Sequence, residues 1–234
     1  MSNSNYRELF THGEGIIPDR GIFNYLSAEE KTELGKSVTF MKFTRHDILF
    51  NQMMPSDHAV YLVKGLIKVH KGGRGERLIC ISLTVPGQFA GLSSVFGSPD
   101  YRFSASAIED TEALMIRKEG LESVLKTNGS FASEMVRIIS EEALAVSEKL
   151  VNFSMKQLPG RVADLLQYFS SEVFHRNECT VPLTRLELAE LIGTTKESLI
   201  RTLNEFKHDR IIDLDGKKIN ILSPDLITML SKLG

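Results

Sequence analysis

Residues 183–203 read LTRLELAELIGTTKESLIRTL, a pattern that predicts two short helices joined by a glycine turn. Thr184 and Glu187 have the spacing of a capping box, which satisfies the first amide groups of a helix that begins there. Gly193 suits the left-handed turn that ends this helix, because glycine carries no Cβ to clash in that conformation. The stretch therefore predicts a helix-turn-helix.

The second helix of the pair has one apolar and one polar face. It is capped by Thr194 or Thr195, and three apolar residues at helical spacing are predicted to face inward: Leu199, Leu203 and Phe206. Four polar residues then point outward near its N-terminus: Lys196, Glu197, Ser198 and Arg201. A recognition helix touches base edges with this end. Glu197 has a second interpretation, because it lies three residues after Thr194 and is also placed to close a capping box.

A hairpin is predicted directly after the helix pair. Residues 211–222 read IIDLDGKKINIL, with alternating apolar residues on both sides of Asp215-Gly216. A capped helix pair alone also occurs in all-α proteins that have no role on DNA. With the hairpin added, the pattern is that of a winged helix-turn-helix and favours sequence-specific binding of double-stranded DNA.

The N-terminal half has the pattern of a β-protein. From Ser37 to Arg117, short apolar runs are punctuated by glycine. Residues 60–70 alternate, the glycines of 72–75 turn the chain, and residues 78–83 return with the same alternation. Further turns are marked by Pro86-Gly87 and by residues 97–100. These short strands predict an antiparallel roll or barrel.

A long helix is predicted between the two halves, over residues 130–154. Its apolar residues recur at intervals of four and three: Ala132, Val136, Ile139, Ala143, Val146, Leu150 and Phe153. This heptad seam favours a parallel homodimer, although the same helix is also able to pack on its own domain. Pro159-Gly160 is predicted to break or redirect the chain within residues 152–160, with the domain boundary close to Gln157. A helix is then predicted over 161–169 with four inward residues: Val162, Leu165, Leu166 and Phe169.

Composition narrows the class of protein. The 234 residues include 28 Lys plus Arg and 30 Asp plus Glu, so the net charge is −2 and attraction to phosphate must come from a local face. No apolar run reaches the roughly 18 residues of a membrane span, and the polar N-terminus does not read as a signal peptide. Cys80 and Cys179 are too few for a disulfide framework. We therefore expect a cytoplasmic protein with reduced thiols and no membrane partner.

These features together resemble the Crp/Fnr superfamily of bacterial transcription regulators. Residues 87–102 are similar to its phosphate-binding cassette, residues 147–163 to its dimer-helix end and hinge, and residues 184–201 to its DNA-reading motif. The resemblance implies an α+β fold with an N-terminal antiparallel β-roll (a cyclic-nucleotide-binding-like jelly roll), a long dimerisation helix and a C-terminal winged helix-turn-helix. The implied domains are a sensor, a dimerisation helix with hinge, and a DNA-binding domain, over 1–129, 130–157 and 158–234.

The resemblance also implies partners and contact residues. It implies a homodimer through residues 130–154 that reads an inverted-repeat operator, with RNA polymerase as a further partner. Lys196 stands where relatives often carry an arginine that reads guanine, Glu197 matches a residue that accepts from cytosine N4, and Arg201 matches one that reads guanine or a neighbouring base. Thr184 and Arg185 match residues that touch phosphate. The predicted DNA-binding residues are Thr184, Arg185, Thr195, Lys196, Glu197, Ser198 and Arg201.

The effector pocket implied by the resemblance departs from the cyclic-nucleotide pattern. Its six candidates are Gly91, Leu92, Arg102, Phe103, Val146 and Ser147. Leu92 replaces a glutamate that binds the ribose hydroxyl, and leucine cannot accept a hydrogen bond. Phe103 replaces a serine and Val146 a threonine, while Arg102 and Ser147 are retained. The pattern disfavours cyclic AMP and favours a hydrophobic effector or none.

Other functions find less support in the sequence. An iron–sulfur cluster needs about four thiolates, and the chain has 2 cysteines. Haem-binding relatives use a histidine of the roll, for which His58 or His70 is available, but a lone histidine on a strand is more often solvated. We find no ordered catalytic triad, metal-spaced cluster or phosphate-binding glycine loop, so we do not expect an enzyme. Two alternatives remain open, a protein-interaction module that keeps the winged helix as scaffold and an effector-independent regulator.

Overall fold

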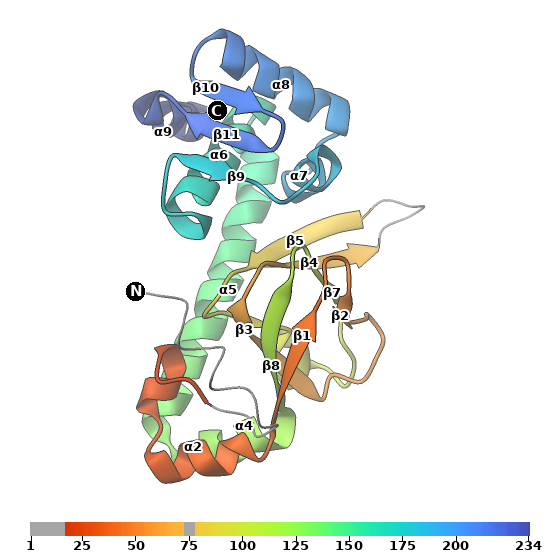
Figure 1. Ribbon diagram of the computed structural model, residues 1–234, viewed down its shortest axis with the longest axis vertical. Coiled ribbons are helices and arrows are strands. Elements are labelled where there is room, and N and C mark those ends of the chain that lie inside the picture. Colours follow the sequence, from red (N-terminus) through yellow and green to blue (C-terminus); the bar gives the residue numbers. More distant parts are fainter. Residues whose placement is uncertain (1–16, 73–77) are drawn as a thin grey trace. The chain divides into compact units, whose positions relative to one another are not determined.

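The computed structural model describes residues 17–72 and 78–234 (Figure 1). It divides into two compact units. The first takes in the described residues up to Lys71 together with Ser82–Ala143, and the second takes in the described residues of Gly72–Ile81 together with Leu144–Gly234. Over the described ranges, the chain contains no helix that is both long and apolar enough to cross a membrane.

The N-terminal half of the chain forms two four-stranded antiparallel sheets, which confirms the predicted β-roll. The strand orders are β1-β8-β3-β6 and β2-β7-β4-β5. The strands are β1 Val38–Phe43, β2 Ile48–Phe50, β3 His58–Lys64, β4 Ile67–Gly72, β5 Leu78–Thr84, β6 Phe89–Ala90, β7 Ser104–Ala107 and β8 Thr111–Arg117. Strand β3 is buried from Ala59 to Val63 and pairs with β8, so these two strands form the centre of the core.

Short helices of the first unit were not predicted. They are η1 Gly21–Tyr25, α2 Ala28–Gly35, α3 Leu92–Gly97 and α4 Lys118–Thr127. Helix α2 begins with a capping box between Ser27 and Glu30, a local signal that the sequence contains. The others lack such a signal, and tertiary contacts stabilise them. In η1, for example, the Phe23 ring packs edge-on against Tyr61 with 4.8 Å between centroids.

Residues 60–70 were predicted to alternate as one strand, and the structure differs at Gly65. They form two strands, β3 and β4, because the chain turns at Gly65 with φ +98°. A Cβ at this position would lie 2.5 Å from Thr111 Oγ1, so both the backbone angle and the space require glycine. The predicted turn at 72–75 falls mostly outside the described residues.

Helix α5, Gly129–Met155, confirms the long helix and runs through both units. The break predicted within residues 152–160 is confirmed, but it does not lie at Pro159-Gly160 themselves. Helix α6, Leu158–Tyr168, already includes both residues, because proline is tolerated in the first turn of a helix, where no intrahelical N–H bond is lost. The chain leaves helical geometry earlier, at Gln157, which is extended with ψ 167°.

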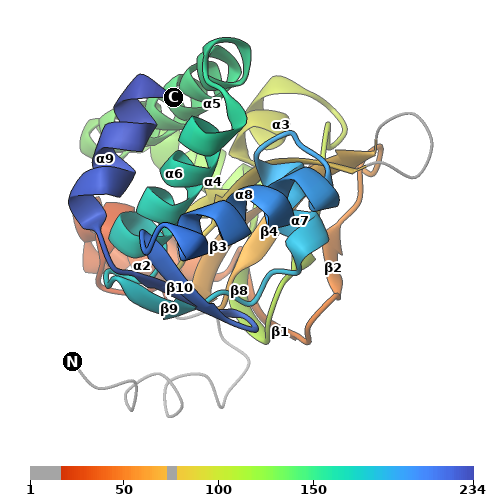
Figure 2. The same ribbon diagram turned by 90° about the horizontal axis from the view of Figure 1, so that it is seen from above.

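The second unit contains the winged helix-turn-helix (Figures 1 and 2). After α6 come η2 Phe169–Val173, β9 Glu178–Thr180, α7 Arg185–Leu191, α8 Lys196–His208, β10 Ile212–Asp215, β11 Lys218–Ile221 and α9 Pro224–Leu233. Helix α6 packs against α8 and α9. The four residues predicted to face inward are all buried, although Phe169 belongs to η2 rather than to α6. The predicted hairpin is β10–β11, and the unpredicted β9 adds a third strand to it.

Candidate nucleic-acid interface

The predicted cap of the first helix is present at the start of α7. The Thr184 hydroxyl accepts a hydrogen bond from the Glu187 amide at 3.2 Å, and the Glu187 carboxylate accepts one from the Thr184 amide at 2.8 Å. Gly193 follows α7 with φ +65°, the predicted left-handed conformation. Both ends of α7 are therefore defined by the residues that the sequence indicated.

Helix α8 starts at Thr195, which decides between the two candidate caps. Its hydroxyl accepts a hydrogen bond from the Ser198 amide at 3.2 Å and donates one to the Ser198 hydroxyl at 3.0 Å. Glu197 is the second residue of the helix and lies outside this cap, so the interpretation of Glu197 as a capping residue is wrong. Its carboxylate is left available for another role.

The two faces of α8 separate as predicted. The apolar face is buried and consists of Leu199, Leu203 and Phe206, joined by Thr202. Lys196, Glu197 and Arg201 are exposed on the other face. With the rest of the described chain, these three form neither a hydrogen bond nor an ion pair. They are held by the buried face of the helix and are free to meet a ligand.

The exposed residues of α8 lie in two different recesses. One has a volume of about 330 Å³ and is lined by Leu183, Thr184, Arg185, Leu186, Lys196, Gly216 and Lys217. The other is more open, about 660 Å³, and is lined by Glu197, Ile200, Arg201, Asn204, Glu205, His208 and Asp209. Lys196 thus shares its surroundings with two other cations, whereas Glu197 and Arg201 lie together one helical turn apart.

The wing turns one residue later than predicted. Asp215 pairs with Lys218, so the turn residues are Gly216 and Lys217. Only Gly216 of these has a positive φ, +55°, which matches a hairpin turn with glycine in its first central position. Lys217 was not among the predicted DNA-binding residues, because the sequence indicated Asp215-Gly216 as the turn and so placed Lys217 after it.

Arg185 connects α7 to the wing. Its Nη2 donates a 2.7 Å hydrogen bond to the Gly216 carbonyl, and burial lowers the pKa of its guanidinium. Lys217 is tied in a similar way, by a 3.1 Å bond from Nζ to the Pro182 carbonyl. Part of the Arg185 side chain, predicted to touch phosphate, therefore holds the hairpin in place.

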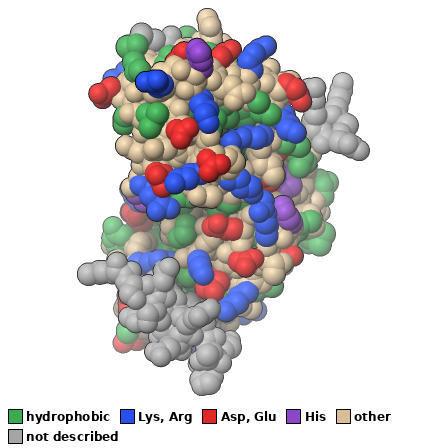
Figure 3. All heavy atoms as spheres, turned by 45° about the horizontal axis from the view of Figure 1, so that its top comes forward, with side chains coloured by type: hydrophobic (Ala, Val, Ile, Leu, Met, Phe, Trp, Pro, Cys, Tyr) green, Lys and Arg blue, Asp and Glu red, His purple; other side chains and the backbone are tan. Residues whose placement is uncertain are grey.

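Charge on the visible face is mixed rather than uniformly basic. In Figure 3, Lys and Arg side chains are interspersed with Asp and Glu over the part of the molecule that is turned forward. Acidic residues also line the more open recess, where Glu205 and Asp209 accompany Arg201. Such a surface gives little general attraction to phosphate, so its recognition must rest on individual contacts.

Three of the predicted effector residues in the first unit are buried or make contacts with other residues of the chain. Gly91 precedes α3 with φ +88°, and Leu92 is 0% exposed in the core. Arg102 Nε donates to the Ser98 hydroxyl at 2.9 Å, and the centroid of the Phe103 ring lies 5.7 Å from Lys71 Nζ. Leu92 is therefore a core residue, and the guanidinium of Arg102 already has a neutral partner.

The other two effector candidates belong to the second unit. Val146 and Ser147 lie on α5, and both are exposed, Val146 by 51%.

Among the residues considered for haem or redox chemistry, Cys80 and Cys179 are both buried. His70 is partly buried, burial and Lys68 lower its pKa, and its Nδ1 has no hydrogen-bond partner in the described part of the chain. In that part, the structure also contains no cluster of three or more His, Cys, Asp or Glu suited to a metal ion.

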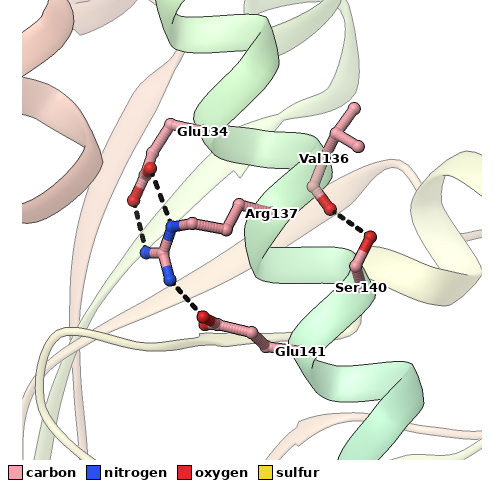
Figure 4. A network of polar contacts seen from close by, with 5 residues as sticks. All are labelled: Glu134, Val136, Arg137, Ser140 and Glu141. Atoms are coloured by element: carbon pink, nitrogen blue, oxygen red, sulfur yellow. Dashed lines mark hydrogen bonds and ion pairs between the residues drawn. The ribbon is translucent and has the colours of Figure 1, made fainter.

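Helix α5 carries an exposed apolar stripe. Three large residues of the predicted seam are exposed, Val136 by 64%, Val146 by 51% and Leu150 by 67%, and the smaller Ala143 is exposed as well. Beside them, Arg137 bridges Glu134 and Glu141, with its Nε 2.9 Å from Glu134 (Figure 4). This is a polar flank of the kind that borders helix pairs.

Phe153 departs from the predicted seam. It is half-buried, and its ring lies against Gly193, where an added Cβ would be 3.4 Å away. The heptad spacing extends to Phe153, but its ring packs against the turn after α7 instead of lying on the exposed stripe. The seam exposed on α5 therefore ends at Leu150.

Family models match both parts of the chain. A model described as a Crp-like helix-turn-helix domain matches residues 160–228, and one described as a cyclic nucleotide-binding domain matches residues 40–128. The matched regions contain the recognition helix and the roll described above.

Individual relatives cover most of the chain at low identity. A CRP-like cAMP-activated global transcriptional regulator of Mycobacterium tuberculosis is 24% identical, over 88% of this chain and 94% of its own. The anaerobic regulatory protein of Bacillus subtilis is 24% identical, over 81% and 82%. Among solved structures, FixK2 from Bradyrhizobium japonicum superposes with a TM-score of 0.77 at 19% identity, covering 82% of this chain and 96% of that one.

Proposed function

Because the chain belongs to the Crp/Fnr superfamily of transcription regulators, we propose that it works as a homodimer that reads an inverted-repeat operator in double-stranded DNA. Members of this superfamily are non-enzymatic DNA-binding proteins. We further propose that an effector other than cyclic AMP, or none, acts through the roll. The proposed setting is the bacterial cytoplasm, with RNA polymerase as a further partner.

The observation that carries the DNA proposal is the exposed, unpaired set Lys196, Glu197 and Arg201 on a helix whose other face is buried. Glu197 and Arg201 share one recess, which supports direct contact with base edges: glutamate with cytosine N4 and arginine with guanine O6 and N7. Thr195 and Ser198 hold the helix start beside them. We assign base reading to Glu197 and Arg201.

Lys196 has a different assignment. It shares the smaller recess with Arg185, Thr184 and Lys217, next to the wing. Three cationic side chains around a recess suit the phosphate oxygens of a DNA strand, which contribute affinity and register but no sequence information. We therefore assign phosphate contact to this recess, with Arg185 also keeping the wing in position.

Dimerisation through residues 130–154 is supported by the stripe of Val136, Val146 and Leu150. Apolar side chains exposed by half or more along one helix lose contact with water when a second helix covers them. A two-fold dimer places two copies of α8 about one helical turn of DNA apart, near 34 Å. This spacing matches inverted half-sites.

An effector other than cyclic AMP is supported by the cassette. Leu92 is a core residue and offers no polar group to a ribose, whereas Arg102 is exposed and donates only from its Nε to Ser98. The Mycobacterium relative is named for activation by cyclic AMP, and this chain differs from the cyclic-nucleotide pattern at Leu92. A hydrophobic effector is the ligand that the apolar replacements favour.

The DNA proposal is tested by fluorescence anisotropy at one fixed salt concentration. The duplex is first selected from a random pool with the full-length protein. The triple variant Lys196→Ala, Glu197→Ala, Arg201→Ala is expected to lose affinity by roughly 100-fold or more, because each specific contact contributes about 1–3 kcal/mol. Arg176→Ala, which removes an exposed cation of the same unit, is the control and should stay within about twofold. Equal binding of selected and scrambled duplexes by the unmodified protein would overturn the proposal.

The dimer is tested by light scattering after size-exclusion chromatography. The protein should elute at twice its chain mass of 26.2 kDa. Leu150→Glu is expected to produce monomers, because it places a charge in the seam. Leu144→Glu is a matched control, since Leu144 is 63% exposed on the same helix but lies off the seam. A dimer that survives Leu150→Glu and not Leu144→Glu would contradict the proposed interface.

A further inference from the structure

Phe153 lies near the end of α5, where two cations approach its ring. Lys149 Nζ is 5.6 Å from the ring centroid and Arg161 Cζ is 5.8 Å from it. Cations within about 6 Å of an aromatic centroid are attracted by the ring's quadrupole. The ring therefore joins one cation of α5 to one of α6.

Each of these cations also holds backbone carbonyls. Lys149 Nζ donates to the carbonyls of Cys80 at 3.0 Å and Ile81 at 2.9 Å, both in strand β5. Arg161 Nη1 donates to the carbonyls of Ile192 at 2.9 Å and Gly193 at 3.2 Å. These last two carbonyls follow the end of α7, where a helix leaves acceptors without intrahelical partners.

The ring contacts the helix-turn-helix turn directly as well. A Cβ on Gly193 would lie 3.4 Å from one Phe153 ring carbon and 3.6 Å from Arg161 Nη1, so the turn fits against both side chains. The Nε of Arg161 is buried and finds no partner among the described residues. The guanidinium is thus held by the two carbonyls and the ring.

We propose that Phe153 and Arg161 are positioning residues, which hold the turn between α7 and α8 against the end of α5 and thereby set the orientation of the recognition helix. Lys149 anchors the same ring from the side of β5. The inference rests on the proposed function, because orientation matters only if α8 reads DNA and α5 forms the dimer. A neighbouring ion pair joins other residues: Lys156 pairs with Asp164 of α6 at 2.8 Å.

The proposed contact should affect how strictly the protein selects the spacing between the two half-sites of its operator. In a dimer, the orientation of α8 relative to α5 determines the distance between the two reading helices. A loosened turn should therefore cost selectivity for half-site spacing more than it costs general affinity for DNA. A contact with only a structural role would lower stability and leave the preference for spacing unchanged.

The test compares the selected operator with versions lengthened or shortened by one base pair between the half-sites. Phe153→Leu keeps the apolar bulk and removes the ring, and Arg161→Met keeps the length and removes the donors. Both should lower binding to the correct operator about tenfold and bring its ratio to the altered spacings close to one. The matched controls Phe174→Leu and Arg176→Met, in the same unit but away from the turn, should retain the ratio. Unchanged spacing selectivity in Phe153→Leu and Arg161→Met would overturn the proposal.

Hydrogen exchange without DNA separates this inference from the proposed function. Amides of residues 192–196 should exchange at least several-fold faster in Arg161→Met, while those of the hairpin at 212–221 keep their rates. If the unmodified protein selects no duplex, the proposed function fails, and faster exchange at 192–196 still supports the contact. Unchanged exchange at 192–196 would contradict the positioning role in either case.

Discussion

The recognition helix and the sensor cassette each lie within a matched family model, but they differ in which polar groups they present. In α8, Glu197 and Arg201 are exposed and unpaired within the described chain. In the cassette, Leu92 is a core residue and Arg102 already donates to Ser98. The clear difference is at Glu197 and Leu92: the first is an exposed carboxylate, and the second is a buried side chain with no polar group to offer. The comparison teaches that a family position indicates function only when its side chain is still available.

The largest expected effect is a difference in operator binding between two variants, one at Arg201 of α8 and one at Arg102 of the cassette. Arg201→Ala should weaken operator binding by roughly 1–3 kcal/mol per half-site, because it removes a base contact. Arg102→Ala should leave operator binding within about twofold, with or without cyclic AMP. Anisotropy titrations of both variants, each in the presence and absence of cyclic AMP, measure this difference. A cyclic AMP response that disappears in Arg102→Ala would break the comparison, since the cassette would then be a working site.

The sensor unit also carries a carboxyl group that should make stability depend on pH. Burial raises the pKa of Glu142 from its usual 4.5 to about 7. The folded protein then retains this proton while the unfolded chain has lost it, so stability falls as pH rises from about 4.5 to 7 and falls no further above that. The effect is at most roughly 3 kcal/mol.

Glu142→Gln should remove this part of the pH dependence. Relative to the unmodified protein, it should be more stable at pH 8 and differ little at pH 4.5, as measured by urea unfolding. Glu141→Gln is the matched control, because Glu141 is exposed and pairs with Arg137. Parallel pH curves for the unmodified protein and Glu142→Gln would show that Glu142 is solvated in solution.

The cassette and the reading region also differ in the stability that each should lose when a glycine with positive φ is replaced by alanine. Gly91 has φ +88°, and a Cβ there would lie 3.2 Å from the rings of Phe50 and Tyr101. Gly216 of the wing has φ +55°, with nothing within 4 Å of the same position. Gly91→Ala should cost about 1–3 kcal/mol, from strain plus crowding, and Gly216→Ala about 1 kcal/mol, from the backbone angle alone. Thermal unfolding measures both, and equal losses would show that the cassette relaxes around the added methyl group.

The smallest expected effect concerns Lys196 within the reading region itself. If it contacts phosphate, Lys196→Ala should weaken selected and scrambled duplexes by the same factor and reduce the salt slope of binding by about one per contact. Glu197→Ala should instead alter the preferred base and leave the salt slope unchanged. Titrations at several salt concentrations distinguish the two assignments. A change in base preference in Lys196→Ala would place this residue among the base readers.

Much of the reading region could be predicted from sequence because its signals are local. The capping box, the left-handed glycine and the apolar spacing of α8 all involve residues within about four positions of one another. The roll was predictable as a class for the same reason, since alternation is a property of neighbours. The boundaries of its strands were less predictable, because the break at Gly65 depends on contact with Thr111, which is remote in sequence.

The amino-acid sequence by itself determined the winged helix-turn-helix, the long apolar seam on α5, and the leucine at position 92 that disfavours a cyclic nucleotide. Only the tertiary structure decided which polar groups remain available and which hold the fold together. Arg185 binds Gly216, and Arg161 binds Ile192, each across 31 residues of chain. Local patterns cannot specify such pairs, because the partners meet only after the helices and the hairpin have packed on a common core.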